Sequence, residues 1–486
     1  MNGGASASEP AVAKEHCTMD LPDASRRAVL GSGLLTAAAL TAGPTKPAAA
    51  TTRAERAASA PFRAITEFGV TVASRDADDA PDQSRAVSRA IAETAKTGTP
   101  LLFPPGRYRL ADISLPDHAH LIGVAGQSII EFAGGPALFA IRGARDVHLE
   151  GLALDGRRRP FVTRNNRRPT GALIQGEGAF QLELRDLAVA NSLVNGIALE
   201  GCHARIDRCT ITDCGDTAIF TRNGRDSRIE NNRIERCGNN GIRVWRSEKG
   251  EDGTIVVNNI VRRIADRAGG TGQNGNGINI FRADAVQVLN NRITDCAFTA
   301  IRGNAASDIQ MVANHCLRLG EVALYAEFGF DGALIANNLI DGAATGISVT
   351  NFNDGGRLAV VQGNLIRNLA LRDDPDARGI GIGVEADTAV TGNVIENAPT
   401  VGLAIGWGRY MRNVTATGNL IRRAGIGIGI TGVKGAGTVF VTNNMLTETP
   451  GGAIRTMDHA RAFGPDLARA DAGPRSNFTV FGNVSS

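Results

Sequence analysis

Four residues of this sequence combine a chemically useful side chain with a position that recurs along the chain: Arg302, Tyr325, Glu327 and Glu385. Each lies in a short apolar segment whose clearest copies read Gly-Ile-x-Val, and these segments are expected to be β-strands. Successive residues of a strand point to opposite faces, so if the Ile and Val face inward, the residues on either side of the Val face outward. The four residues would then share one outer face of a stack of strands, where they could meet a substrate.

The two glutamates point to hydrolysis of a glycosidic bond, because glycoside hydrolases of the usual kind need two carboxyl groups. Glu327 and Glu385 occupy the same outward column two repeats apart, which separates them by roughly 9.6 Å at about 4.8 Å per stacked strand. Inverting hydrolases hold their carboxyl groups about 6.5–9.5 Å apart, so this pair falls at the outer edge of that range. Asp354 could contribute a further carboxylate from a turn.

Arg302 and Tyr325 point instead to a polysaccharide lyase, which needs a base near the uronate C5 proton and a cation to neutralise the carboxylate. Arg302 would neutralise that carboxylate, with Arg243 nearby, and Tyr325 would move the proton, since an arginine rarely loses its own. Calcium needs several oxygen ligands, and Glu327 with Asn304 supplies only a few of them. We therefore expect neither a metal ion nor another cofactor.

The outward positions that come first along the chain carry aromatic, amide and arginine side chains. An outward strand face needs no such aromatic residues for folding, whereas a sugar chain can stack its rings on them and hydrogen-bond its hydroxyl groups to the amides. The predicted substrate-binding residues are Arg243, Trp245, Asn279, Phe281, Asn304, Asn351, Asn353, Trp407 and Arg409. Two alternatives stay open: the loop after Trp245 could fold over this face and bury it, or the face could hold a glycan or a surface partner without catalysis.

The strands that carry these residues belong to an internal repeat marked by asparagine. Asn-Asn-x-Ile and its variants place an asparagine at positions 232, 259, 291, 314, 338, 364, 393, 419, 444 and 483, in steps of 23 to 32 residues before a last step of 39. Steps of this length, with three short strands each, predict an all-β fold: a single-stranded right-handed parallel β-helix over residues 126–486. We expect the asparagines to form a hydrogen-bonded ladder, with Cys209 at an equivalent place and Cys214, Cys237 and Cys296 packed inward.

Residues 63–125 contain a series of features that predict a cap for the first turn. They are Phe68-Gly69-Val70, Asp78-Asp79, a helical stretch from about Asp82 to Thr97, and Phe103-Pro104-Pro105-Gly106 followed by Tyr108. A helix here would cover the open strand edges and the exposed core of the first turn. In this order the features resemble the N-terminal cap of the pectate-lyase-like and polygalacturonase-like β-helix superfamily, whose substrate groove lies on the face predicted above. Polygalacturonases use clustered Asp residues on that face, and this sequence lacks the cluster, so the resemblance implies a fold and not a reaction.

Residues 1–50 predict a twin-arginine export signal, and residues 51–62 a linker. Arg26-Arg27 precedes a short apolar run, and Ala48-Ala49-Ala50 supplies a small-residue cleavage site. The run is too short for a membrane span, so none is expected in the mature chain. Together with the cap and the repeat, this leader resembles an uncharacterised family of twin-arginine-translocated repeat proteins. The resemblance implies a periplasmic or secreted location and the twin-arginine translocase as a partner during export.

The composition narrows the partners further. The net charge is +3, which gives no electrostatic case for a nucleic acid partner. We therefore expect an exported, carbohydrate-active β-helix protein that cleaves a polysaccharide by hydrolysis or elimination, or binds a glycan without cleaving it.

Overall fold

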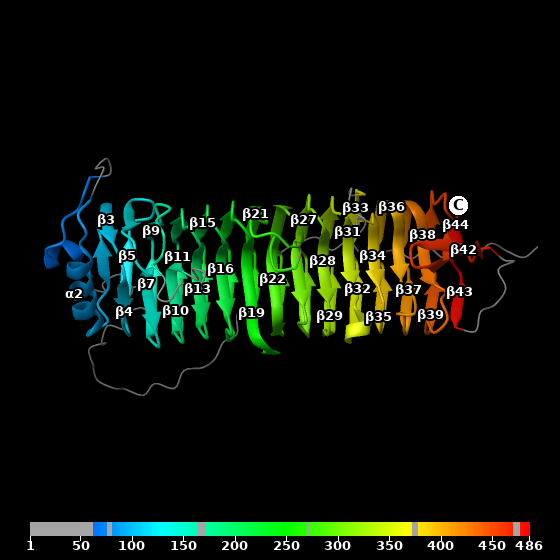
Figure 1. Ribbon diagram of the computed structural model, residues 1–486, viewed down its shortest axis with the longest axis horizontal. Helices are drawn as coiled ribbons and strands as arrows, with labels where there is room; N and C mark the ends of the chain where they lie inside the picture. The colour runs from blue at the N-terminus through cyan, green and yellow to red at the C-terminus, as the bar shows by residue number, and fades with distance from the viewer. Residues whose placement is uncertain (1–61, 75–79, 163–170, 271, 372–377, 470–476) are drawn as a thin grey trace, which may run out of the picture. The chain divides into compact units, whose positions relative to one another are not determined.

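The computed structural model describes residues 62–74, 80–162, 171–270, 272–371, 378–469 and 477–486. These residues belong to the unit Ser59–Ser486, in which short strands stack in parallel along a solenoid (Figure 1). The predicted export signal and residues 51–61 of the predicted linker lie outside the described residues. None of the helices in the described ranges is long and apolar enough to cross a membrane.

Each turn of the solenoid contributes strands to three columns, and each strand pairs in parallel with the strands of the turns before and after it. One column is the 16-stranded sheet. The other two, the site column and the second column, form one 28-stranded sheet, in which β36 (Val394–Ile405) and β38 (Leu420–Thr431) are long enough to pair in both columns. These pairings confirm the predicted parallel β-helix.

The 16-stranded sheet consists of β1 (Arg63–Ala64), β2 (Leu101–Phe103), β5 (His120–Gly123), β8 (Arg145–Glu150), β11 (Phe180–Arg185), β14 (His203–Asp207), β17 (Arg228–Glu230), β20 (Ile255–Val257), β23 (Gln287–Leu289), β26 (Ile309–Val312), β29 (Asp331–Ala336), β32 (Arg357–Gln362), β35 (Thr388–Thr391), β37 (Val414–Thr417), β39 (Val439–Thr442) and β43 (Phe478–Phe481). The site column consists of β4 (Ile113–Leu115), β7 (Ala137–Arg142), β10 (Ala172–Glu177), β13 (Asn195–Glu200), β16 (Thr217–Arg222), β19 (Asn240–Glu251), β22 (Asn276–Asp284), β25 (Ile301–Asn304), β28 (Val322–Glu327), β31 (Thr345–Val349), β34 (Ile380–Val384), the second halves of β36 and β38, and β41 (Ile454–Asp458), which a hairpin joins to β42 (Arg461–Asp466). The second column consists of β3 (Gly106–Leu110), β6 (Ser128–Phe132), β9 (Ala153–Asp155), β12 (Ala188–Ala190), β15 (Thr210–Thr212), β18 (Arg233–Glu235), β21 (Ile260–Ile264), β24 (Arg292–Cys296), β27 (His315–Leu317), β30 (Leu339–Asp341), β33 (Leu365–Arg367), the first halves of β36 and β38, β40 (Met445–Thr447) and β44 (Val484–Ser485).

The first turn is covered by a short 3-10 helix, η1 (Ile65–Phe68), and by the helix α2 (Ser84–Ala95). The helix α2 confirms the predicted helical stretch, and Asp82 accepts a hydrogen bond from the backbone N–H of Ser84 at its start, at 2.9 Å. Its buried face consists of Val87, Ala90, Ile91, Thr94 and Ala95. The stacked strands begin within the range predicted for the cap, because β2, β3 and β4 already pair with the next turn. The helix therefore closes the core at this end of the stack.

The core is filled by the inward residues of the strands, which repeat at the same register from turn to turn. In the site column Ile278, Ile301, Leu324, Ile347 and Ile382 pair in sequence, and each is fully buried. β-Branched side chains suit this arrangement because few rotamers are lost when they pack on a pleated surface. Their inward direction fixes the outward direction of the residues between them.

The predicted asparagine ladder is confirmed along its whole length, from Asn232 to Asn483. From Asn259 onward, each ladder side chain is an acceptor for the backbone N–H and the side-chain amide of the ladder residue one turn before it; between Asn291 and Asn314 these distances are 3.0 and 3.1 Å. Each also donates to a backbone carbonyl, as Asn314 does to Val288 at 2.9 Å. Cys209 occupies the equivalent place before Asn232 and donates its backbone N–H to it at 2.9 Å. The ladder thus pairs polar groups that the turns would otherwise bury without partners.

The other predicted cysteine positions are also structural. Cys214, Cys237 and Cys296 are buried at equivalent places in the repeat, and Cys214 lies close enough to Cys237 for a hydrogen bond. The neighbouring Cys237, together with burial, holds the pKa of the Cys214 thiol well above its usual value. These cysteines therefore pack as small apolar side chains.

Replacing one ladder asparagine in the middle of the stack tests how much the solenoid depends on the ladder. We expect Asn314→Ala to lower the free energy of unfolding by about 3 kcal/mol, because it leaves several buried donors and acceptors unpaired at about 1–3 kcal/mol each. Asn483→Ala, at the partly exposed end of the ladder, should cost only about 1 kcal/mol. Urea unfolding followed by circular dichroism measures both variants, and equal losses would contradict the dependence on burial.

Candidate functional site

The outward residues of the site column fall in register, as the sequence predicts. Asn279 pairs with Arg302, Arg302 with Tyr325, Tyr325 with Ser348, and Ser348 with Gly383. The second outward position runs in parallel two residues further along each strand, through Phe281, Asn304 and Glu327. The strands thus align the candidate residues, and the surrounding segments decide which of them a ligand could reach.

Arg243 and Asn279 are buried, which corrects the expectation that they line an open groove. The Arg243 guanidinium donates to the Asn274 side chain at 2.8 Å and to the backbone carbonyl of Gln273 at 3.3 Å, and the Asn279 amide donates to the carbonyl of Gly272 at 3.2 Å. The covering segment is therefore residues 272–274. It is not the stretch directly after Trp245, because β19 continues as a strand to Glu251.

Trp245 and Phe281 remain partly exposed beside this covered region. Their rings meet edge to face with centroids 5.6 Å apart, and the Trp245 indole N–H donates to the Asn279 side chain at 3.1 Å. The guanidinium of Arg243 lies 5.0 Å from the Trp245 ring. These contacts hold the two rings against each other and hold Trp245 against Arg243 and Asn279, which the covering segment buries.

Arg302 and Glu327 form a buried ion pair on adjacent strands. The Arg302 guanidinium donates to both carboxylate oxygens of Glu327, at 2.6 and 2.9 Å, and Asn304 donates to one of them at 2.7 Å. The side chains of Arg302 and Glu327 are only 8% and 2% exposed. Glu327 is thus satisfied inside the structure, which corrects the expectation that it faces a substrate. Arg302 is committed to the same pair and also lies 3.7 Å from Glu321.

Beyond this ion pair the site column opens into a cleft of about 440 Å³. Its floor follows β28, β31, β34 and β36, where the outward residues Ser348, Gly383 and Ala404 are small. Side chains with hydroxyl, amide, charged and aromatic groups surround this floor: Glu321, Tyr325, Thr345, Thr350, Asn351, Arg378, Glu385 and Trp407. The turns of the column that look featureless in sequence are therefore the ones that leave room for a ligand.

Tyr325 stands where the cleft meets the Arg302–Glu327 pair. The Arg302 guanidinium lies 5.0 Å from the centre of the Tyr325 ring. Burial and the nearby charge of Glu327 raise the pKa of Tyr325 to about 12, while a hydrogen bond with Thr350 and the charge of Arg302 lower it by less. Tyr325 is therefore protonated at neutral pH, so it can donate a hydrogen bond to a ligand but cannot act as a base.

Glu385 follows β34 at one side of the cleft and is mostly buried. Its carboxylate accepts a hydrogen bond from the backbone N–H of Phe352 at 2.7 Å, and the backbone N–H of Asn351 also donates to it. Burial raises the pKa of Glu385 above its ordinary value, the charge of Asp354 adds to the rise, and the two amides lower it by less. Glu385 therefore stays protonated to a higher pH than an exposed glutamate does.

The remaining predicted binding residues lie in two segments beside the cleft, one at the short 3-10 helix η2 (Phe352–Asp354) and one in the turn after β36. Asn351 lines it, whereas Asn353 is exposed and donates to Asp354 at 2.8 Å. Trp407 lines it too, with the Arg378 guanidinium 4.3 Å from its ring centre and the His459 ring packed edge-on at 5.1 Å. Arg409 is exposed and lies outside the lining, 5.3 Å from the Tyr410 ring.

The carboxyl groups around the cleft do not form a close catalytic pair. Glu321 precedes Val322, which pairs through Thr345 with Ile380, and Glu385 follows Ile380 by five residues. Six residues at about 3.3 Å each put the two glutamates roughly 20 Å apart along the strands, well beyond the separation that glycoside hydrolases use. Glu327 is nearer to Glu385 but is held by Arg302.

The sequence prediction missed Glu321, Ser348, Gly383 and Arg378 as residues of the site. Glu321 precedes its strand, and Arg378 precedes β34, so neither occupies a regular outward position. Ser348 and Gly383 were on the predicted face, and the signal that could have identified them is the run of small side chains down one column.

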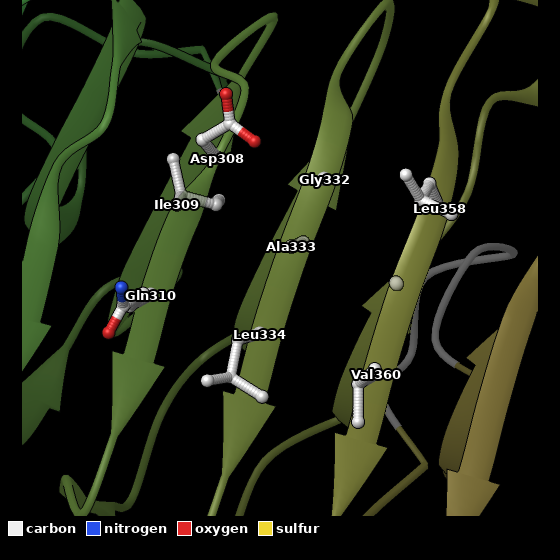
Figure 2. Close-up of a pocket in the computed structure, with 9 residues that line it drawn as sticks. Asp308, Ile309, Gln310, Gly332, Ala333, Leu334, Leu358 and Val360 are labelled. Atoms are coloured by element: carbon white, nitrogen blue, oxygen red, sulfur yellow. The ribbon is translucent and has the colours of Figure 1, made fainter.

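A second depression lies on the 16-stranded sheet (Figure 2). It has a volume of about 330 Å³ and lies over β26, β29 and β32, where Leu334, Leu358 and Val360 are exposed or partly exposed. Asp308 supplies the one carboxylate of its lining. This shallow and largely apolar surface lacks the converging polar groups of the cleft.

The fold and the cleft define a parallel β-helix with one hollowed outer face. The sequence model of the family described as right handed beta helix region matches residues 151–272 and 249–416, which together span more than half of the chain. The chain therefore belongs to this right-handed β-helix family. No curated protein matches the sequence significantly.

Solved structures with a similar fold have diverse titles. The catalytic unit of a GH87 α-1,3-glucanase from Streptomyces thermodiastaticus is 15% identical, with 88% of this chain and 69% of that chain covered and a TM-score of 0.44. The mannuronan C-5 epimerase AlgE6 A-module of Azotobacter vinelandii is 15% identical, with 88% and 99% covered and a TM-score of 0.39. PfbA, a surface adhesin of Streptococcus pneumoniae, is 15% identical, with 87% and 99% covered and a TM-score of 0.41. At these values the likeness concerns the fold alone.

The buried ion pair leads to a prediction about stability. We expect Glu327→Gln to lower the free energy of unfolding by about 3 kcal/mol, because it leaves the buried charge of Arg302 without its bidentate partner. The matched control is Asp295→Asn, which breaks a bidentate pair with the exposed Arg318 and should cost less than about 1 kcal/mol. Urea unfolding of both variants tests the difference. An unchanged stability in Glu327→Gln would show that the pair is not structural.

Proposed function

We propose that this chain is an exported glycan-binding protein whose cleft over β28, β31, β34 and β36 holds part of a polysaccharide. The observation that carries the proposal is the small-residue floor of the cleft, flanked by Tyr325 and Trp407. A sugar ring needs flat space, an apolar contact for its C–H face and hydrogen-bonding groups for its hydroxyls, and the cleft offers all three. The Arg26-Arg27 leader with its cleavage site supports export through the twin-arginine translocase to the periplasm or beyond.

The polar groups around the floor suit neutral hydroxyl groups. Thr345, Ser348 and Thr350 can each donate or accept a hydrogen bond, and Asn351 can do both at once. Tyr325 adds a donor that stays protonated at neutral pH. Both aromatic rings already carry an arginine within 5.0 Å of the ring centre, which restricts their rotation and leaves them preorganised for stacking.

Filling the floor of the cleft tests the proposal directly. A Cβ added at Gly383 would meet no atom within 4 Å, and its backbone does not have a positive φ, so a side chain can be added there without backbone strain or a clash at its Cβ. We expect Gly383→Leu to weaken glycan binding at least tenfold by occupying the space of a sugar ring, and Gly383→Ala to weaken it slightly. A glycan array identifies the ligand, and isothermal titration calorimetry then gives the affinities. Undiminished binding by Gly383→Leu would place the glycan elsewhere.

Cleavage of the bound glycan is a second candidate, and the raised pKa of Glu385 favours it. A carboxyl group with a raised pKa keeps its proton to a higher pH and can act as a general acid on a glycosidic oxygen, and Asp354 is the neighbouring carboxylate that could activate water. An eliminating lyase is less well supported, because Glu327 occupies Arg302 and the high pKa of Tyr325 prevents it from serving as a base.

Two readouts distinguish these reactions on the ligands that the array identifies. Hydrolysis releases reducing ends without absorbance near 235 nm, whereas elimination produces both signals. If Glu385 is the acid, activity should fall as the pH rises through its raised pKa, because the carboxyl group loses the proton that it must donate. Glu385→Gln should then abolish reducing-end formation while retaining the fold. A fully active Glu385→Gln variant would exclude the role, and binding without either signal would leave the non-catalytic function.

A further inference from the structure

We infer that the cleft selects glycan chains that carry free amino groups and rejects chains built from uronic acids. The inference rests on the proposed function, since it names the class of glycan that the same cleft would hold. It follows from the distribution of charge around the cleft and behind it.

The lining of the cleft carries more acidic than basic side chains. Among the residues that the structure describes, the carboxyl groups of the lining are Glu321 and Glu385, and its arginine is Arg378. The Arg378 guanidinium is stacked on Trp407, at 4.3 Å from the ring centre. Asp354 lies just outside and close enough to Glu385 to influence its titration. In the described part of the lining, a ligand therefore meets more carboxyl groups than cations.

Of the two arginines near the cleft, Arg378 is stacked on Trp407 and Arg302 is already neutralised. Arg302 lies behind Tyr325. Two of its guanidinium nitrogens donate to the Glu327 carboxylate, and the third lies 3.7 Å from Glu321. Arg302 is also only 8% exposed in its side chain. A uronate carboxylate would thus approach Glu321 and Glu385 without gaining Arg302 as a partner, and like charges in such proximity oppose binding.

An ammonium group reverses each of these effects. It can donate charge-assisted hydrogen bonds to a carboxylate, which are roughly twice as strong as those between neutral groups. Burial raises the pKa of Glu385, and a bound cation would favour its ionised form and so recover part of the cost of burial.

The positions of the two glutamates favour a chain over a single sugar. They lie at opposite ends of the strands that form the floor, roughly 20 Å apart along the strand direction. One sugar ring cannot reach both, whereas an oligosaccharide can place different amino groups near each. General attraction is not the cause, because the whole chain has a net charge of +3 and would repel a polycation.

The test compares three probes of equal length with the full chain by isothermal titration calorimetry: a deacetylated chito-oligosaccharide, its fully N-acetylated counterpart and an oligogalacturonate. We expect the deacetylated chain to bind at least tenfold more tightly than the acetylated one and the oligogalacturonate not to bind. Glu385→Gln and Glu321→Gln should each weaken binding of the deacetylated chain about tenfold and change binding of the acetylated chain little. The control is Asp308→Asn, which removes an exposed carboxylate from the 16-stranded sheet and should change neither affinity.

The outcomes separate the inference from the proposed function. Equal binding of the acetylated and deacetylated chains, or tighter binding of the oligogalacturonate, would overturn the inference while leaving a glycan-binding cleft. Loss of affinity in Asp308→Asn as large as in the two Glu variants would also overturn it, because the attraction would then not come from the cleft. If the array and all three probes show no glycan binding, the proposed function fails and the inference fails with it. Near-ultraviolet circular dichroism of the Gln variants confirms that any loss does not come from unfolding.

Discussion

The hydrogen bond from one ladder asparagine to the next is the interaction on which the rest of the structure depends. It ties each turn to its neighbour at a fixed spacing, and it satisfies backbone groups that the tight turns would otherwise bury without partners. With the spacing fixed, the inward Ile and Val side chains meet their counterparts one turn away and fill the core. The outward residues must then fall into straight columns, and the cleft exists because several small residues follow one another in one of these columns.

The regular parts of the molecule could be predicted from the sequence because they repeat. The ladder positions, the three strands per turn, the capping helix and the registers of Arg302 with Tyr325 and of Asn304 with Glu327 all follow from periodic spacing. The exposure of the outward residues could not be predicted in the same way, because it depends on non-repeating segments. Residues 272–274 cover Arg243 and Asn279, and nothing periodic in the sequence indicates where that segment lies.

The misjudged residues of the site also have physical explanations. Glu327 and Arg302 carry opposite charges on adjacent strands. Opposite charges at that spacing pair with each other, so neither side chain is left available to a ligand. Small residues such as Ser348 and Gly383 have little chemistry of their own, so a search for reactive groups passes over them. They nevertheless leave open space beside accessible polar groups, which the positions with larger, more reactive side chains do not.

The single-column construction of the cleft has an evolutionary consequence. The floor residues occupy outward positions, and a Cβ added at Gly383 would meet no atom within 4 Å, so exchanges between small and large residues there would shorten or lengthen the cleft without disturbing the stack. Duplication of a whole turn would add a unit of binding surface at the same spacing. The length of the ligand that such a solenoid binds can therefore change by one turn at a time, while the stability of its scaffold stays the same.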